Sequence, residues 1–226
     1  DPRAGHEAVT RAILVDLGKV LVGFDHGITC ERLAEATGVP AGRLRGVLFG
    51  PLESELDRGR LRPDEFFRAC EREAGLPRLP DPVWVRAWRD IFHPLPGAIA
   101  ALSRVRAGVR RVLVSNTNVL HWEGVLSVFD PVPLFDAVVL SYRIGAAKPE
   151  AAFWSAALAA AACAPAECVY ADDRPELVEA AARAGIPGFV VDGPAALVSG
   201  LEARRLLAET PPPGGNTPGP RDVRLS

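Results

Sequence analysis

Residues 11–17 read RAILVDL, a short apolar run that ends in an acid and is followed by Gly18. An apolar run of this length is typical of a strand that is buried on both faces of a parallel sheet. We therefore expect residues 11–17 to form such a strand. Its acid, Asp16, would then lie at the carboxyl edge of the sheet, where open parallel sheets bind ligands.

Similar apolar runs recur later in the chain, and helix-like stretches separate them. The runs are 109–115 (VRRVLVS), 135–141 (FDAVVLS), 167–171 (ECVYA) and 188–191 (GFVV), and the helix-like stretches are 117–128, 150–162 and 175–184. Strands that alternate with helices indicate βαβ units. The predicted fold class is α/β, with a Rossmann-like parallel sheet and helices on both of its faces.

Residues 28–92 break this rhythm, because they show helical patterns only. The predicted helices are 28–36, 41–49, 64–74 and 82–92, and one of them has a good start at Pro63 and a good stop at Gly75. We interpret this block as an α-helical cap inserted after the first strand. The predicted division is a core of residues 11–24 and 94–208, a cap of residues 25–93 and a disordered C-terminal tail of residues 209–226, which contains TPPPGGNTPGP.

Charge and apolar run length indicate which classes of partner this protein can bind. The 226 residues carry a net charge of −2 without a basic half, so we expect no nucleic-acid partner. The longest apolar runs are too short to span a membrane, and the N-terminus lacks the order of a signal peptide. The expectation is a cytoplasmic monomer or homodimer that acts on a small molecule.

Four predicted strands deliver polar residues to one rim of the sheet. The first strand gives Asp16, the second gives Ser115 and Asn116, the third leads through a loop to Lys148, and the fourth gives Asp172 and Asp173. Each of these alone has an ordinary explanation as a helix cap, a helix N-terminus or a solvated charge. Their convergence in this order favours a catalytic site.

These residue types suit the hydrolysis of a phosphate ester. The ester is anionic, so the site must neutralise its charge. Carboxylates of Asp16, Asp172 and Asp173, with the backbone carbonyl of Gly18, would hold Mg²⁺, which prefers hard oxygen ligands. We favour Asp172 as the direct ligand because it is the first acid after its strand. Ser115, Asn116 and Lys148 would bind the phosphate, and Asp16 would attack it.

The same residues carry a resemblance to a known family. ILVDLGKVLVGFD, VLVSNTN, SYRIGAAKPE and VYADDRPELVEAAARAG resemble, in this order, the four motifs of the haloacid-dehalogenase-like (HAD) hydrolase superfamily. The resemblance extends over roughly residues 12–207, and the helical insert lies where that superfamily places one type of cap. It implies an aspartyl-phosphate on Asp16, with Lys148 orienting nucleophile and phosphate. The motifs are most similar to a bacterial subgroup that includes alpha-D-glucose-1-phosphate phosphatase, which implies a sugar phosphate or a related small phosphomonoester, such as a hexose 1-phosphate, as substrate.

One position departs from the family pattern. Typical HAD phosphatases carry a second Asp two residues after the nucleophile, as general acid and base, and here that position is Gly18. Lys19 and His121 are candidate proton donors. Two alternatives therefore stay open: a metal-independent 2-haloacid dehalogenase, which the paired acids argue against, and a weakly active or non-catalytic relative that binds a ligand or a partner protein.

Few residues of the predicted cap are clear candidates for contact with the substrate. Its charged stretch around Gly59, which includes Glu53 and Asp57, is interpreted as a solvated turn, with contact to a sugar hydroxyl as the alternative. Trp84 and Trp88 are interpreted as cap packing, and His26 as a linker residue. Outside the cap, Trp122 is a candidate to line the pocket.

Overall fold

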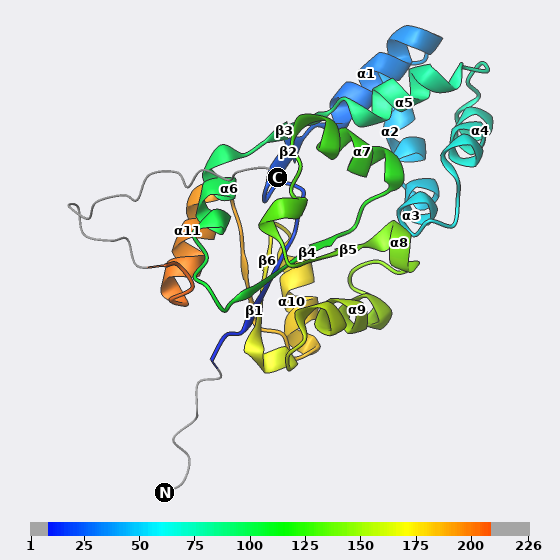
Figure 1. Cartoon of the computed structure of the whole chain (residues 1–226). Coiled ribbons are helices and arrows are strands. Elements are labelled where there is room, and N and C mark those ends of the chain that lie inside the picture. The colour runs from blue at the N-terminus through cyan, green and yellow to red at the C-terminus, as the bar shows by residue number, and fades with distance from the viewer. Residues whose placement is uncertain (1–8, 209–226) are drawn as a thin grey trace, which may run out of the picture.

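The first apolar run forms the central strand of a parallel sheet. In the computed structural model, which describes residues 9–208, β1 (Ala12–Val15) pairs in parallel with β4 (Arg110–Ser115) and with β6 (Cys168–Asp172). The strands β5 (Ala137–Leu140) and β7 (Gly188–Val190) complete the order β5-β4-β1-β6-β7 (Figure 1). The predicted α/β fold class is confirmed, and each predicted strand is present.

Side chains of β1 alternate between two apolar layers. Ile13 and Val15 belong to a cluster shared with α6 (Pro96–Ser103) and α11 (Pro194–Ala203), whereas Ala12 and Leu14 belong to a cluster shared with α9 (Ala151–Ala161) and α10 (Pro175–Arg183). Figure 1 shows the first pair of helices on one side of the sheet and the second pair on the other. Because both faces are covered, the strand reads as a continuous apolar run.

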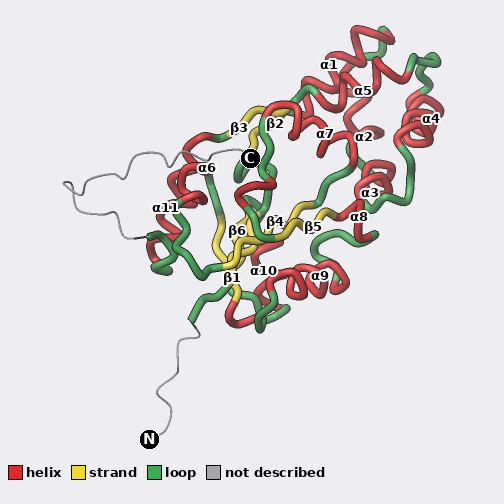
Figure 2. The backbone as a smooth tube through the Cα atoms, in the orientation of Figure 1, coloured by secondary structure: helices red, strands yellow, loops and turns green. Residues whose placement is uncertain are grey.

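The helical insert lies between two short strands. β2 (Val22–Phe24) and β3 (Phe92–Pro94) pair antiparallel, with Gly23 opposite His93, so the chain leaves the sheet and returns to it at the same place. The helices of the insert are α1 (His26–Thr37), α2 (Ala41–Leu48), α3 (Pro51–Asp57), α4 (Pro63–Ala74) and α5 (Asp81–Arg89). Figure 2 shows this group of helices projecting beyond the sheet, with the two strands at its base.

The insert has an apolar core of its own. Trp84 and Trp88 are fully buried there, so their interpretation as packing residues is confirmed. The predicted start and stop of α4 are also confirmed: Pro63 is its first residue, and the chain leaves the helix through Gly75 with a φ of 64°.

Several elements were not expected from the sequence. They are the strands β2 and β3, the helices α3, α6, α8 (Ser141–Ile144) and α11, and the 3-10 turns η1 (Val132–Leu134) and η2 (Pro165–Glu167). The helix α7 (Val119–Val128), in contrast, was expected. The interpretation of Glu53 to Asp57 as a solvated turn is wrong. A helix starts with Pro51 at its first turn, and the reversal comes only at Gly59, where φ is 65°.

The tail predicted for residues 209–226 lies outside the described residues. Within residues 9–208, no helix combines the length and the apolar character that a membrane crossing requires.

Gly124 lets the insert approach the core closely. A Cβ at this position of α7 would lie 2.4 Å from the carbonyl oxygen of Arg89, at the end of α5, and 2.9 Å from the ring of Phe92. We expect Gly124→Ala to lower the free energy of unfolding by about 1–3 kcal/mol, because backbone atoms would have to move apart. Urea unfolding should show a lower midpoint with an unchanged slope.

Gly46 provides the matched control. It lies inside α2, and nothing surrounds its Cβ position within 4 Å. Gly46→Ala should raise stability by up to about 1 kcal/mol through helix propensity alone. Equal effects of the two substitutions would contradict the close approach at Gly124.

Candidate active site

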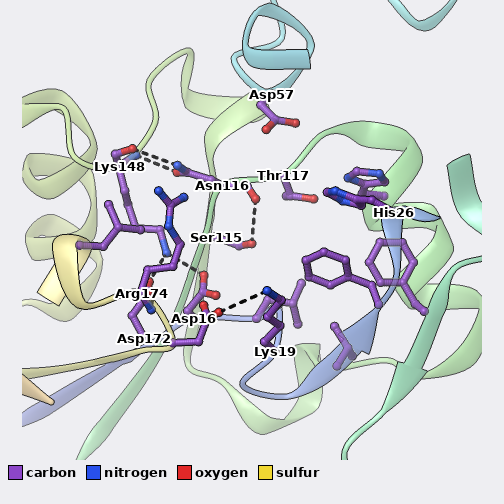
Figure 3. Close-up of a pocket in the computed structure, with 18 of the residues that line it drawn as sticks. Asp16, Lys19, His26, Asp57, Ser115, Asn116, Thr117, Lys148, Asp172 and Arg174 are labelled. Atoms are coloured by element: carbon purple, nitrogen blue, oxygen red, sulfur yellow. Dashed lines mark hydrogen bonds and ion pairs between the residues drawn. The ribbon is translucent and has the colours of Figure 1, made fainter. Parts of the chain in front are cut away.

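Three neighbouring strands bring acids and a hydroxyl to one edge of the sheet. Asp16 follows β1 directly, and its N–H continues the ladder by donating to the carbonyl of Ala171 at 2.9 Å. Ser115 ends β4 and Asp172 ends β6. Because these strands are parallel and adjacent, their carboxyl ends meet, and the residues line a cavity of about 450 Å³ (Figure 3).

The side chain of Lys148 joins these strand ends. Its Nζ donates to Asp16 Oδ1 at 2.7 Å, to Asp172 Oδ2 at 2.8 Å, to the Tyr170 hydroxyl at 2.9 Å and to the Val114 carbonyl at 3.3 Å. The lysine is only 5% exposed, so its charge depends on these acceptors. We call Asp16, Ser115, Lys148, Asp172 and Asp173 the floor of the cavity.

The loop that carries Lys148 is fixed by Asn116. The Lys148 N–H donates to Asn116 Oδ1 at 2.7 Å, and Asn116 Nδ2 donates to the Lys148 carbonyl at 3.0 Å. Although Asn116 lines the cavity as predicted, its amide group is therefore used to position the lysine.

Burial shifts the pKa values of the floor. It raises the pKa of Asp16 to about 7; the charge of Lys148 opposes this rise and that of Asp172 adds to it. Burial alone would lower the pKa of Lys148, but Asp16 and Asp172 outweigh it, so the pKa is raised and the lysine keeps its proton. Burial also raises the pKa of Tyr170, whose hydroxyl donates to Asp172.

Sequence reasoning missed Tyr170, although a signal was present. It lies two residues before Asp172 on the same strand, and side chains two apart on a strand point to the same face. The hydroxyl is therefore placed to contact both Lys148 and Asp172.

Three carboxylates of the floor suit a divalent cation. Oxygens of Asp16, Asp172 and Asp173 lie within 4.8 Å of one another. Asp172 is fully buried and also accepts the Arg174 N–H at 2.8 Å, whereas Asp173 is half-buried and lies 4.0 Å from the Lys19 ammonium. This set of hard oxygen donors fits Mg²⁺, with the carbonyl of Gly18 available from the cavity wall.

Packing explains the missing side chain at position 18. A Cβ on Gly18 would lie 2.9 Å from Cε1 of Phe24, so the ring occupies the space that a side chain would need. All residues predicted for the site nevertheless line this one cavity, and their individual roles stay predictions.

A second group of polar residues lines the cavity from the other side. These are His26 of α1, Glu53 and Asp57 of α3 and His121 of α7, which we call the roof. The interpretation of His26 as a linker residue is therefore wrong. Trp122, in contrast, is 4% exposed within the apolar cluster shared with α6 and α11, and it is not among the residues that line the cavity.

A family model for haloacid dehalogenase-like hydrolases matches residues 10–185. The chain belongs to this hydrolase family. The matched range runs from β1 through α10 and contains the floor and the roof of the cavity.

Solved structures of other HAD proteins share the fold. A HAD family enzyme from Bacteroides thetaiotaomicron, in complex with magnesium and inorganic phosphate, is 24% identical over 81% of this chain and 95% of its own, with a TM-score of 0.71. A predicted HAD-like family hydrolase from Porphyromonas gingivalis is 25% identical over 82% and 93%, with a TM-score of 0.70. The L-2-haloacid dehalogenase from Xanthobacter autotrophicus is 18% identical over 81% and 78%, with a TM-score of 0.60.

The link between Asn116 and Lys148 can be tested in this hydrolase through stability. We expect Asn116→Ala to lower the free energy of unfolding by about 1–3 kcal/mol, because two buried backbone groups of Lys148 lose their partners. Urea unfolding measures the loss. In Ser155→Ala, where an exposed hydroxyl bonds only within its own helix, the change should stay within about 0.5 kcal/mol. Equal losses would contradict the positioning role of Asn116.

Proposed function

We propose that this HAD hydrolase is a magnesium-dependent phosphatase that forms an aspartyl-phosphate on Asp16. The observation that carries the proposal is the meeting of three carboxylates, Asp16, Asp172 and Asp173, within 4.8 Å beside a buried lysine. Such a site can hold both a divalent cation and the anionic phosphoryl group. The magnesium and phosphate bound to the Bacteroides relative support the same interpretation.

The residues of the floor have different roles in the proposed reaction. Asp16, Asp172, Asp173 and the Gly18 carbonyl would hold Mg²⁺, which supplies positive charge against the phosphoryl oxygens. Asp16 then attacks phosphorus through a carboxylate oxygen, while the Lys148 ammonium fixes the orientation of that carboxylate.

Ser115 completes the phosphate site. Its hydroxyl lines the cavity at the end of β4, where it can donate to a phosphoryl oxygen. The backbone N–H of Asn116 belongs to the same strand end and adds a second group near the phosphate. The side chain of Asn116 serves Lys148 instead.

The substrate we propose is a small sugar phosphate, such as a hexose 1-phosphate. A cavity of about 450 Å³ fits a ligand of this size, and its roof offers polar groups for hydroxyls. The motifs resemble those of the alpha-D-glucose-1-phosphate phosphatase subgroup, which supports the same substrate class. The helices between β2 and β3 would act as the cap that excludes water during the reaction.

A metal-independent dehalogenase is the second candidate, because the Xanthobacter dehalogenase shares the fold. The carboxylates of Asp172 and Asp173 speak against it. Two further acids beside the nucleophile add negative charge to the site, which disfavours the binding of an anionic 2-haloacid without a metal ion.

The substrate and the dependence on Mg²⁺ separate the two candidates, and substitution of Asp16 tests the nucleophile that both would use. We expect the wild type to release nitrophenol from 4-nitrophenyl phosphate only with Mg²⁺, and Asp16→Asn to lose about 10³-fold or more in kcat, because an amide is a poor nucleophile. The amide oxygen can still accept from Lys148, so the fold should persist. Asp192→Asn, on an exposed residue outside the cavity, is the control and should retain activity.

Other outcomes would contradict the proposal. Release of halide from a 2-haloacid without metal, lost in Asp16→Asn, would identify a dehalogenase. Absence of both activities in the wild type would favour a non-catalytic binding protein.

A further inference from the structure

The proposed phosphatase lacks a proton carrier on the floor of its cavity. Two protons must move in the reaction, one to the leaving alcohol and one from the attacking water. The ring of Phe24 fills the space beside Gly18, and Lys148 is held by four acceptors with a raised pKa. The carboxylates of the floor are needed as nucleophile and as ligands for the cation. Lys19 also lines the cavity, but its side chain is largely exposed and its ammonium lies 4.0 Å from Asp173, beside the proposed ligands of the cation. This leaves the roof as the wall that supplies the proton carrier.

Glu53 and Asp57 lie one turn apart on α3, and both line the cavity. Asn118 Nδ2 donates to Asp57 Oδ1 at 2.8 Å, which fixes this carboxylate beside the loop that follows β4. Figure 3 shows Asp57 across the cavity from Asp16, with Ser115, Asn116 and Thr117 between them. A leaving group on a phosphate bound at the floor would extend toward this side.

His121 provides an independent sign that the roof binds a ligand. Its N–H donates to Asn118 Oδ1 at 3.0 Å, so the Asn118 amide nitrogen faces His121 Nδ1 at 3.1 Å. An amide NH₂ can only donate, so Nδ1 must accept and Nε2 carries the hydrogen. His121 is 8% exposed, and Nε2 is buried without an acceptor among the described residues. A buried donor without a partner costs about 1–3 kcal/mol, which a ligand or the Glu53 carboxyl would recover.

We propose that the Glu53–Asp57 carboxyl pair is the acid–base group of this enzyme, acting from the roof in place of the side chain that Gly18 lacks. The inference rests on the proposed phosphatase function. It assigns the proton transfers to the cap, so that hydrolysis requires the cap to be seated over the substrate.

The proton cycle balances over the two halves of the reaction. In the first, an Asp16 oxygen bonds to phosphorus, the ester P–O bond breaks with its electron pair on the leaving oxygen, and the pair gives its proton to that oxygen. In the second, water attacks the phosphorus of the aspartyl-phosphate and loses a proton to the pair. The bond from phosphorus to Asp16 then breaks, which restores the carboxylate of Asp16 and the protonated pair.

The environment of the pair leaves one proton on it at neutral pH. Burial and the neighbouring Asp57 raise the pKa of Glu53 to about 9, and burial raises the pKa of Asp57 to about 6, against the opposing effects of Asn118 and Arg58. The other titratable groups facing the pair are Cys70 of α4, His26 of α1 and His121 of α7. Burial lowers the pKa of His26 to about 4 and that of His121 to about 3, so both are neutral.

The residues of the roof could alternatively bind a metal ion. Ring nitrogens of His26 and His121 and an oxygen of Glu53 lie within 4.8 Å of one another. The hydrogen bonds of His121 argue against metal binding. Its Nδ1 accepts from Asn118 and its Nε2 carries a hydrogen, so neither nitrogen has a free lone pair for a metal ion.

The test compares substrates whose leaving groups differ in basicity. An alkyl phosphate such as glycerol 1-phosphate leaves as a basic alkoxide that needs a proton, whereas 4-nitrophenyl phosphate leaves as a weakly basic phenolate. In Glu53→Gln we expect kcat/KM for the alkyl phosphate to fall by about 10²–10⁴-fold, and kcat/KM for the aryl phosphate to fall by a much smaller factor. Glu55→Gln is the matched control, because this residue of α3 is not among those lining the cavity and should leave both values unchanged.

The pH dependence of kcat/KM gives a second test of the carboxyl pair. The donor must be protonated, so kcat/KM for the alkyl phosphate should decline as pH rises through about 9, the pKa of Glu53. Asp57→Asn keeps an oxygen acceptor for Asn118 but removes a charge that raises this pKa, so the decline should move to lower pH. It should also lower kcat for the aryl phosphate, because breakdown of the aspartyl-phosphate needs the proton acceptor.

Three results would overturn the inference. One is equal loss of kcat/KM on both substrates in Glu53→Gln, one is no loss on either, and one is a second equivalent of bound metal that disappears in this variant. Retained aryl phosphatase activity reports that the variant is folded. Failure of the phosphatase function itself would instead appear in the wild type, as absence of magnesium-dependent hydrolysis of either substrate.

Discussion

The buried ammonium group of Lys148 is the interaction on which the site depends. It joins the ends of β1 and β6 by contacts of 2.7 and 2.8 Å, and Asn116 at the end of β4 fixes its backbone. A charge this deeply buried is stable only with such partners, and the carboxylates need it equally. One lysine therefore fixes the relative positions of three strand ends and keeps two acids close enough for one cation.

The cavity has two electrostatically different walls. The floor is charged, with three carboxylates and one lysine, and suits a metal ion and a phosphoryl group. In the roof, burial disfavours the charged forms of the histidines and carboxyls, so the histidines are neutral and the carboxyl pair keeps one proton. This division matches a substrate with an anionic phosphate at one end and a neutral group at the other.

Close packing connects the two walls. Gly18 has no room for a side chain because Phe24 of β2 lies against it, and Gly124 lets α7 approach the end of α5. Asn118, at the start of α7, then reaches Asp57 of α3 while it also caps its own helix. The insert and the sheet thus meet through side chains that line the cavity, so the position of the insert affects the site directly.

The sequence by itself determined the strands of the sheet, the α-helices α7, α9 and α10 that follow them, and the residues of the floor. Strands buried on both faces must be apolar throughout, and parallel strands must end at one edge, so Asp16, Ser115 and Asp172 could be placed together from local pattern alone. Only the tertiary structure decided the roof, the tie between Asn116 and Lys148, and the use of Tyr170. Glu53, Asp57 and His26 look like ordinary polar residues in the chain, and only His121 was a candidate from the sequence. The pKa values of these groups are set by burial, which depends on how separate helices pack.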